Sequence, residues 1–201
     1  MELPAACFRT LIMRLRISFF AFVLGTTLVS AQGTFIYDQQ DTNVVDGTIS
    51  LTQQPLGQSF TPSFSSIDFA EFYLAGGSGA SGAIQVNLFS GSITGTILGT
   101  SATVEYTGTP GFYDFLFPSS ITLSPGTKYY LQVAALGGSG VGANITFQQY
   151  IGGDAIYNGT AHTDRDFWFR EGVITNVPEP SSTALFLVAA GLFFGQIRKR
   201  L

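Results

Sequence analysis

Short runs of alternating apolar and polar residues recur between residues 32 and 176, and they restrict the fold more than any other feature. In AIQVNLF, the apolar residues Ile84, Val86 and Leu88 fall on one side of an extended chain, which is the period-two pattern of a half-buried strand. Segments rich in glycine or containing Pro-Gly, such as AGGSGASG and LSPGT, separate the runs. We therefore predict an all-β body, an antiparallel β-sandwich of jelly-roll type.

The N-terminal residues have the pattern of an export signal. Two arginines in MRLR precede an apolar stretch that ends in the small residues VSA. We predict a helical signal peptide over residues 1–31, with signal peptidase cutting between Ala31 and Gln32. Because the twelve residues before Met13 do not resemble the start of a signal peptide, translation from Met13 is an open alternative.

The C-terminal residues combine three features in order. A VPEP motif at residues 177–180 precedes an apolar run over residues 183–197 and a basic cluster of Arg198, Lys199 and Arg200. A helix over the apolar run rises about 1.5 Å per residue to roughly 22 Å, so as a transmembrane helix it crosses the roughly 30 Å hydrocarbon core only with local thinning or help from flanking residues. The basic cluster marks the cytoplasmic side, which leaves the body outside the cytoplasm.

This arrangement resembles the PEP-CTERM sorting signal of Gram-negative bacteria that make extracellular polysaccharide. The resemblance implies that Val177, Pro178, Glu179 and Pro180 are recognised by an exosortase, a membrane enzyme similar to transpeptidases that cuts near the motif. It also implies a transient stay in the inner membrane, then delivery to the envelope, surface or extracellular matrix, with exopolysaccharide as a candidate partner. The predicted parts are a signal peptide, a β-sandwich domain and a sorting signal, over residues 1–31, 32–176 and 177–201.

The body is strongly acidic. Between residues 32 and 176 three basic residues oppose eleven acidic ones, a net charge of −8 with the single histidine neutral. Such a surface repels phosphate backbones, which argues against sequence-independent binding of nucleic acids. The only cysteine, Cys7, lies in the predicted signal peptide, so the body has no intrachain disulfide and no cysteine nucleophile.

Several motifs of the body follow one another in a recognisable order. GQSFTPSFSSIDFAEFYLAG, GAIQVNLFSG and ITLSPGTKYYLQV look like the motifs of exported β-sandwich modules, including jelly-roll domains related to galactose-binding ones. This resemblance implies the fold and leaves the ligand open, because such modules differ widely in function.

Two features that suggest a catalytic or cofactor site have simpler interpretations. Residues 77–82 satisfy G-x-G-x-x-G, but a strand is expected to follow where a dinucleotide site needs a helix N-terminus. We therefore predict a hairpin loop there and no cofactor. His162 has no cysteine partner and no G-x-S-x-G serine in the sequence, so we interpret it as a surface-loop residue.

Acidic residues near the end of the body are candidates for a calcium site. Asp154, Asp164 and Asp166 offer the hard oxygen ligands that calcium prefers, and pairing of the first and last strands would bring further carboxylates near them. The alternative is that these aspartates stabilise turns by hydrogen bonding to their own backbone.

Aromatic residues in the same region suggest a carbohydrate-binding surface. In DFWFR the alternation places Trp168 on the same side as Asp166 and Arg170, opposite the two phenylalanines. We name Trp168, Tyr157 and Asp166 as candidate glycan contacts, since a flat ring with polar neighbours suits a sugar. Packing of Trp168 within the core or against the second sheet is the alternative.

Two classes of function follow from these patterns. The first is a non-enzymatic exported protein of the cell surface or extracellular matrix that binds glycan. The alternative is a small secreted hydrolase or lyase acting on polysaccharide, which needs two carboxylates about 5 to 9.5 Å apart in one cleft, for example Glu71 with Glu105 or Asp114.

Overall fold

The computed structural model describes residues 33–43 and 45–175, and every helix or strand within them is a strand paired in antiparallel fashion. The predicted all-β, antiparallel fold is confirmed. The predicted signal helix and transmembrane helix lie outside the described residues. The strands are β1 (Thr34–Asp41), β2 (Val45–Ser50), β3 (Gly57–Phe60), β4 (Ser66–Ser90), β5 (Thr96–Thr100), β6 (Val104–Tyr106), β7 (Gly111–Thr122), β8 (Tyr129–Ala135), β9 (Ser139–Phe147), β10 (Ala155–Tyr157), β11 (Thr160–His162), β12 (Arg165–Phe167) and β13 (Phe169–Thr175).

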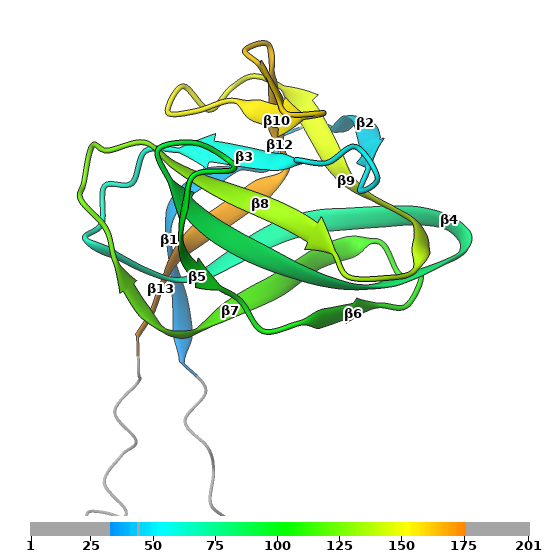
Figure 1. Cartoon of the computed structure of the whole chain (residues 1–201), viewed down its shortest axis with the longest axis horizontal. Helices are drawn as coiled ribbons and strands as arrows, with labels where there is room; N and C mark the ends of the chain where they lie inside the picture. The colour runs from blue at the N-terminus through cyan, green and yellow to red at the C-terminus, as the bar shows by residue number, and fades with distance from the viewer. Residues whose placement is uncertain (1–32, 44, 176–201) are drawn as a thin grey trace, which may run out of the picture. The chain divides into compact units, whose positions relative to one another are not determined.

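The long strand β4 belongs to both sheets of a sandwich-like body (Figure 1). Its first part, up to residue 76, pairs with β7 on one side and with β13 and then β9 on the other, forming sheet A. Its last part, from residue 82, pairs with β5, β6 and β8, forming sheet B. Sheet B continues from β8 through β3 and β10 to β11.

The glycine-rich segment inside β4 is a bend and not the predicted hairpin loop. Gly76 is paired with Val141 and Ser81 with Ser139, both in β9, with a register shift between the two pairs. Gly79 has a φ of +79°, a conformation that L side chains adopt only with strain. Glycine therefore lets one strand turn sharply from sheet A into sheet B, and no helix follows it, so a dinucleotide site of the G-x-G-x-x-G kind does not form there.

The core fills the space between the two sheets. In β4, alternate residues point inward, and Ile84, Val86 and Leu88 are all fully buried, as their spacing predicted. Phe72 and Phe115 enter the same core from sheet A. Side chains between these positions consequently point to the opposite side of each sheet.

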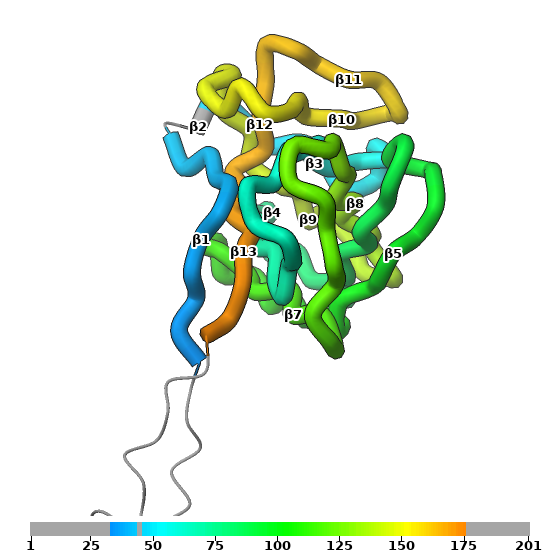
Figure 2. The backbone as a smooth tube through the Cα atoms, turned by 90° about the vertical axis from the view of Figure 1, so that its left-hand side faces the viewer, coloured from blue at the N-terminus to red at the C-terminus, as the bar shows by residue number. Residues whose placement is uncertain are grey.

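The first and last described strands lie side by side, as Figure 2 shows. β1 pairs with β13 along its length, with a bulge at Asp38. The Asp38 carboxylate accepts hydrogen bonds from the backbone N–H groups of Ser63 (2.7 Å) and Phe64 (2.8 Å). This bulge therefore ties β1 to the loop between β3 and β4.

Candidate functional site

Trp168 lies between β12 and β13, at the point where β4 changes its neighbour. Its backbone N–H donates to the carbonyl of Asn144 in β9 (2.8 Å), and its carbonyl accepts from the N–H of Tyr73 in β4 (2.9 Å). β4 pairs with β13 up to Phe72 and with β9 from Leu74. The indole is thereby fixed on sheet A.

Three aromatic rings cluster on the side of sheet A that points away from the core, which we call the outer face. These rings, the aromatic triad, are Tyr73, Phe112 and Trp168. The centroid of Trp168 lies 4.5 Å from that of Tyr73 and 5.3 Å from that of Phe112, and Tyr73 and Phe112 are 5.4 Å apart. Tyr73 and Phe112 are register partners in β4 and β7. All three are half-buried, so the triad keeps an exposed surface.

A charged row crosses the outer face next to the triad and consists of Arg170, Glu71 and Asp114. Glu71 in β4 lies opposite Arg170 in β13 and opposite Asp114 in β7. The Arg170 guanidinium forms an ion pair with Glu71 and stacks over the rings of Phe112 (3.7 Å) and Tyr37 (4.9 Å). Asp114 is exposed, whereas the Glu71 side chain is only 4% exposed.

The burial of Glu71 changes its acidity. Burial and a hydrogen-bond contact with Asp114 raise the pKa of Glu71 to about 7, while the Arg170 charge acts in the opposite direction. Burial dominates because an ionised carboxylate loses its hydration when it enters the protein. Near neutral pH the charged row therefore carries between zero and one net negative charge.

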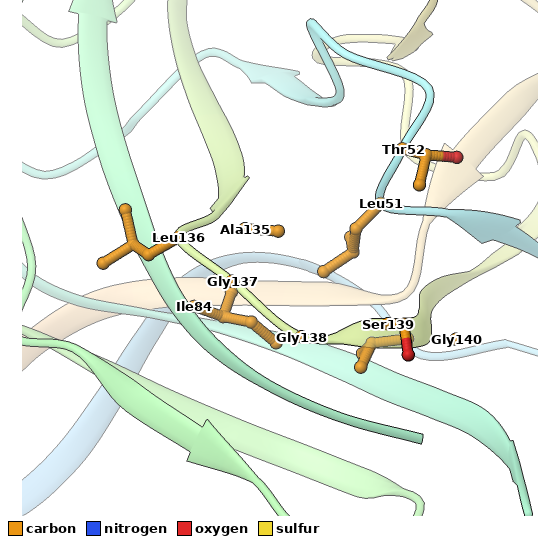
Figure 3. A pocket seen from close by; sticks show the side chains of 10 residues that line it. Leu51, Thr52, Ile84, Ala135, Leu136, Gly137, Gly138, Ser139 and Gly140 are labelled. Carbon is orange, nitrogen blue, oxygen red and sulfur yellow. The ribbon is translucent and has the colours of Figure 1, made fainter. Parts of the chain in front are cut away.

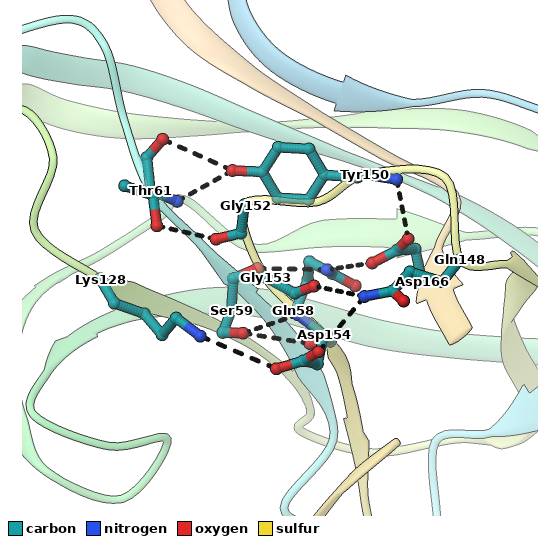
Figure 4. A network of polar contacts seen from close by, with 10 residues as sticks. All are labelled: Gln58, Ser59, Thr61, Lys128, Gln148, Tyr150, Gly152, Gly153, Asp154 and Asp166. Carbon is teal, nitrogen blue, oxygen red and sulfur yellow. Dashed lines mark hydrogen bonds and ion pairs between the residues drawn. The ribbon is translucent and has the colours of Figure 1, made fainter. Parts of the chain in front are cut away.

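Asp166 does not lie on this face, contrary to the prediction from DFWFR. It is fully buried, and Figure 4 shows it within a polar network between β3 and the segment after β9. Its Oδ1 accepts from the Gln58 side chain (2.8 Å), and its Oδ2 accepts from the backbone N–H groups of Gln149 and Tyr150 (3.1 Å each). Burial raises the pKa of Asp166 to about 6, although these donors favour the ionised form.

The predicted glycan contacts are consequently separated. Trp168 is on the outer face and Asp166 is inside, while Tyr157 belongs to the β10–β11 hairpin, where its ring stacks on His162 at 3.5 Å. His162 ends β11 and is half-buried. These positions do not form one surface.

The three aspartates predicted as calcium ligands contact different residues. Asp154 pairs with Lys128 (3.8 Å) and Asp164 with Arg165 (4.0 Å), whereas Asp166 belongs to the buried network. Within residues 33–43 and 45–175, no group of three His, Cys, Asp or Glu side chains is arranged to hold a metal ion.

Two cavities flank the glycine-rich bend and contain no charged side chain. One of about 290 Å³ is lined by Leu51, Ile84 and residues 135–141 (Figure 3). The other, of about 420 Å³, is lined by Thr48, Ser50 and glycine-rich backbone. Neither includes the aromatic triad or the charged row, which lie on the open sheet.

The carboxylates proposed for a hydrolase are distributed over both sheets. Glu71 and Asp114 do meet, because their strands pair in that register, but Glu105 lies exposed on β6 in sheet B.

The prediction from the sequence did not include Tyr73 and Phe112, the aromatic partners of Trp168. The signal was present in DFAEFYL and GFYDFLF, where alternation sets Tyr73 with Glu71 and Phe112 with Asp114.

The buried acid Glu171 lies on the core side of β13. Both of its carboxyl oxygens lack a well-formed hydrogen bond to any described residue. Burial, with a smaller effect of nearby Asp38, raises the pKa of Glu171 to about 9, and the backbone N–H of Gln39 offsets only part of this. At neutral pH the side chain is therefore a neutral acid inside the sheet.

Comparison with known proteins identifies a PEP-CTERM protein-sorting motif at residues 176–200. No curated protein matches the chain. The predicted sorting signal is thus confirmed, and it implies an exported protein that passes through the membrane and is processed by an exosortase. The part of the chain that the structure describes contains no helix long and apolar enough to cross a membrane. The motif residues and the predicted cleavage position between Ala31 and Gln32 lie outside that part.

Proposed function

We propose that the β-sandwich is a non-enzymatic module of the envelope or extracellular matrix of a Gram-negative bacterium, and that its outer face binds carbohydrate. Exopolysaccharide is the ligand we propose. The proposed domain boundaries lie after residue 31, between the signal peptide and the sandwich, and after residue 176, between the sandwich and the sorting signal. The observation that carries the proposal is the aromatic triad beside the charged row, on a protein with an exosortase sorting motif.

The chemistry of the outer face suits a sugar ring. A pyranose has apolar C–H faces that stack on aromatic rings and hydroxyl edges that need hydrogen-bond partners. The triad supplies the rings. Asp114 is an exposed acceptor on β7.

The arrangement supports binding more than hydrolysis. Glycoside hydrolysis needs two carboxyl groups separated by about 5 to 9.5 Å, because the sugar or a water must fit between them. Glu71 and Asp114 are close enough to share a hydrogen bond, and Glu71 is held by Arg170. They also lie outside both cavities, so the hydrolase or lyase alternative has less support.

Sorting is tested by intact mass measurement and C-terminal peptide mapping of the protein recovered from its host. We expect the wild-type protein to lack everything beyond the VPEP region and Glu179→Ala to retain it. Glu105→Ala removes an exposed acid from β6 and should be processed normally. Wild-type protein that still ends in RKRL in the envelope membrane would contradict a transient tail.

Carbohydrate binding is tested on the full chain by calorimetry with the host exopolysaccharide and with neutral oligosaccharides. Trp168→Ala should weaken binding about threefold to tenfold, since one stacked ring contributes roughly 0.5–1.5 kcal/mol. The matched control is Phe147→Ala, which removes an aromatic ring that is 58% exposed and stacks with Arg165 (4.3 Å). Equal losses in both variants, with both folded by circular dichroism, would contradict a site on the outer face.

A further inference from the structure

We infer that the outer face selects glycans that carry free amino groups, with the sugar ammonium bound by Asp114 and the ring stacked on the aromatic triad. This inference rests on the proposed carbohydrate-binding function and names its ligand class. The observation behind it is the balance of charge on the face.

Asp114 is an exposed carboxylate without a cationic partner among the described residues. The three basic side chains of residues 33–43 and 45–175 each pair with other acids: Lys128 with Asp154, Arg165 with Asp46 and Asp164, and Arg170 with Glu71. A positive group on a ligand is therefore the natural partner of Asp114.

Glu71 increases the demand for a cation at this position. Its side chain is 4% exposed, its Oε2 is held by the ion pair with Arg170, and its carboxyl group shares a hydrogen bond with Asp114. Two carboxyl groups thus share one guanidinium in the row. A ligand ammonium beside Asp114 would allow both carboxyl groups to ionise, because Arg170 alone balances only one of them.

The same arrangement disfavours acidic sugars. The only cation of the row, Arg170, is covered by the ring of Phe112 at 3.7 Å and is already paired with Glu71. A uronic acid carboxylate would lie beside Asp114 and the Glu71 carboxyl group, on a body whose formal net charge is −8. Repulsion between like charges makes that encounter unfavourable.

The spacing fits one sugar residue. Asp114 and Phe112 are two positions apart on the same side of β7, which places their backbone positions roughly 7 Å apart. A pyranose ring that covers Phe112 or Trp168 can therefore direct a ring substituent to Asp114. The contact is solvent-exposed, so it should strengthen binding about two- to fivefold, and salt should weaken it.

The test compares three hexasaccharides binding to the full chain by calorimetry at about pH 6, where most sugar amines keep their proton. The probes are a glucosamine hexamer, its fully N-acetylated counterpart and a uronic acid hexamer. We expect the glucosamine hexamer to bind about two- to fivefold more tightly than the acetylated one, and the uronic acid hexamer to bind least.

Two variants separate a local contact from general attraction. Asp114→Asn should abolish the preference for the free amine, because it should weaken binding of the glucosamine hexamer more than binding of the acetylated hexamer. Glu105→Gln removes the same charge from β6 in the other sheet and should keep the preference. An equal loss of preference in both variants would mean that only the overall negative charge attracts the amine, and would overturn the inference.

The remaining outcomes distinguish this inference from the proposed function. Equal affinity for the free and acetylated hexamers, or tighter binding of the uronic acid, would overturn amine selection while leaving carbohydrate binding intact. Binding of none of the three hexamers would contradict both. Binding that survives Trp168→Ala undiminished would place the sugar elsewhere and would also refute the role of Asp114.

Discussion

Replacing Glu171 with Gln should make the protein more stable at neutral and alkaline pH. The Glu171 carboxyl is fully buried on the core side of β13, without a well-formed hydrogen bond to a described residue. A group in this position folds as the neutral acid. Glutamine has nearly the same shape as glutamic acid and cannot ionise. The substitution therefore removes the free-energy cost of protonating a side chain that is ionised in the unfolded state.

The sign follows from proton binding in the two states. The pKa of Glu171 is raised from 4.5 to about 9 in the folded protein, so between these values the folded state holds a proton that the unfolded state has released. Stability must therefore fall as pH rises, by about 1.4 kcal/mol per pH unit. At pH 7 the buried carboxyl group lowers the free energy of unfolding of the wild type by about 3 kcal/mol. In Glu171→Gln the buried amide lacks hydrogen-bond partners, which reduces the gain in stability by about 1 kcal/mol.

The decisive window lies above pH 7. The raised pKa values of Asp166, about 6, and Glu71, about 7, contribute mainly below it. Urea unfolding of the full chain at several pH values from about 7 to about 9 should show the wild-type free energy of unfolding falling by roughly 2–3 kcal/mol, and Glu171→Gln staying nearly flat.

The matched control is Glu105→Gln, which replaces an exposed carboxyl on β6 and should keep the wild-type slope. A wild-type protein whose stability does not change between pH 7 and 9 would refute the reasoning, because Glu171 would then be solvated or paired. A slope that persists in Glu171→Gln would assign the effect to another group.

Three further predictions concern stability. Asp166→Ala should cost about 3 kcal/mol in urea unfolding, because three donors, two of them in buried hydrogen bonds, lose their acceptor. Gly138→Ala should lower the melting temperature and cost about 2 kcal/mol or more, since φ is +91° and the new Cβ would meet the backbone of Ser81. Arg170→Met should raise the pKa of Glu71 above about 7, measurable by carbon-13 NMR, and cost about 3 kcal/mol above that pH and less in acid.

The period-two pattern predicted local strand faces well, because the side of a strand depends only on neighbouring residues. It placed Ile84, Val86 and Leu88 in the core, and it set Trp168 on the same side as Arg170. Local alternation can be read from the sequence wherever a strand keeps one pair of neighbours.

The pattern failed for Asp166 because the strand does not keep its neighbours. Residues before Trp168 pair with β9, whereas residues after it pair with β4 and β1. Asp166 is buried and accepts a hydrogen bond from Gln58 on β3. The partner of each half is decided by the whole sheet, so a window of five residues cannot reveal the break.

The meeting of Glu71 and Asp114 depended on register, which the sequence leaves open. A shift of one residue between β4 and β7 would have placed Asp114 beside core positions. The register is instead fixed by pairs such as Tyr73 with Phe112, whose rings must fall on the same side. Sequence could therefore propose the two acids as partners but could not choose Asp114 over Glu105.

The composition of the outer face is costly for a sheet that needs only to be soluble. Burying Glu71 beside Arg170 sacrifices hydration that the ion pair only partly restores, and the half-buried rings of Tyr73, Phe112 and Trp168 leave apolar surface in water. Small polar residues at these positions would avoid both costs. A ligand that covers the rings would reduce the second cost, and a positive charge beside Asp114 would favour the ionised row, which supports the proposed binding of an amino sugar.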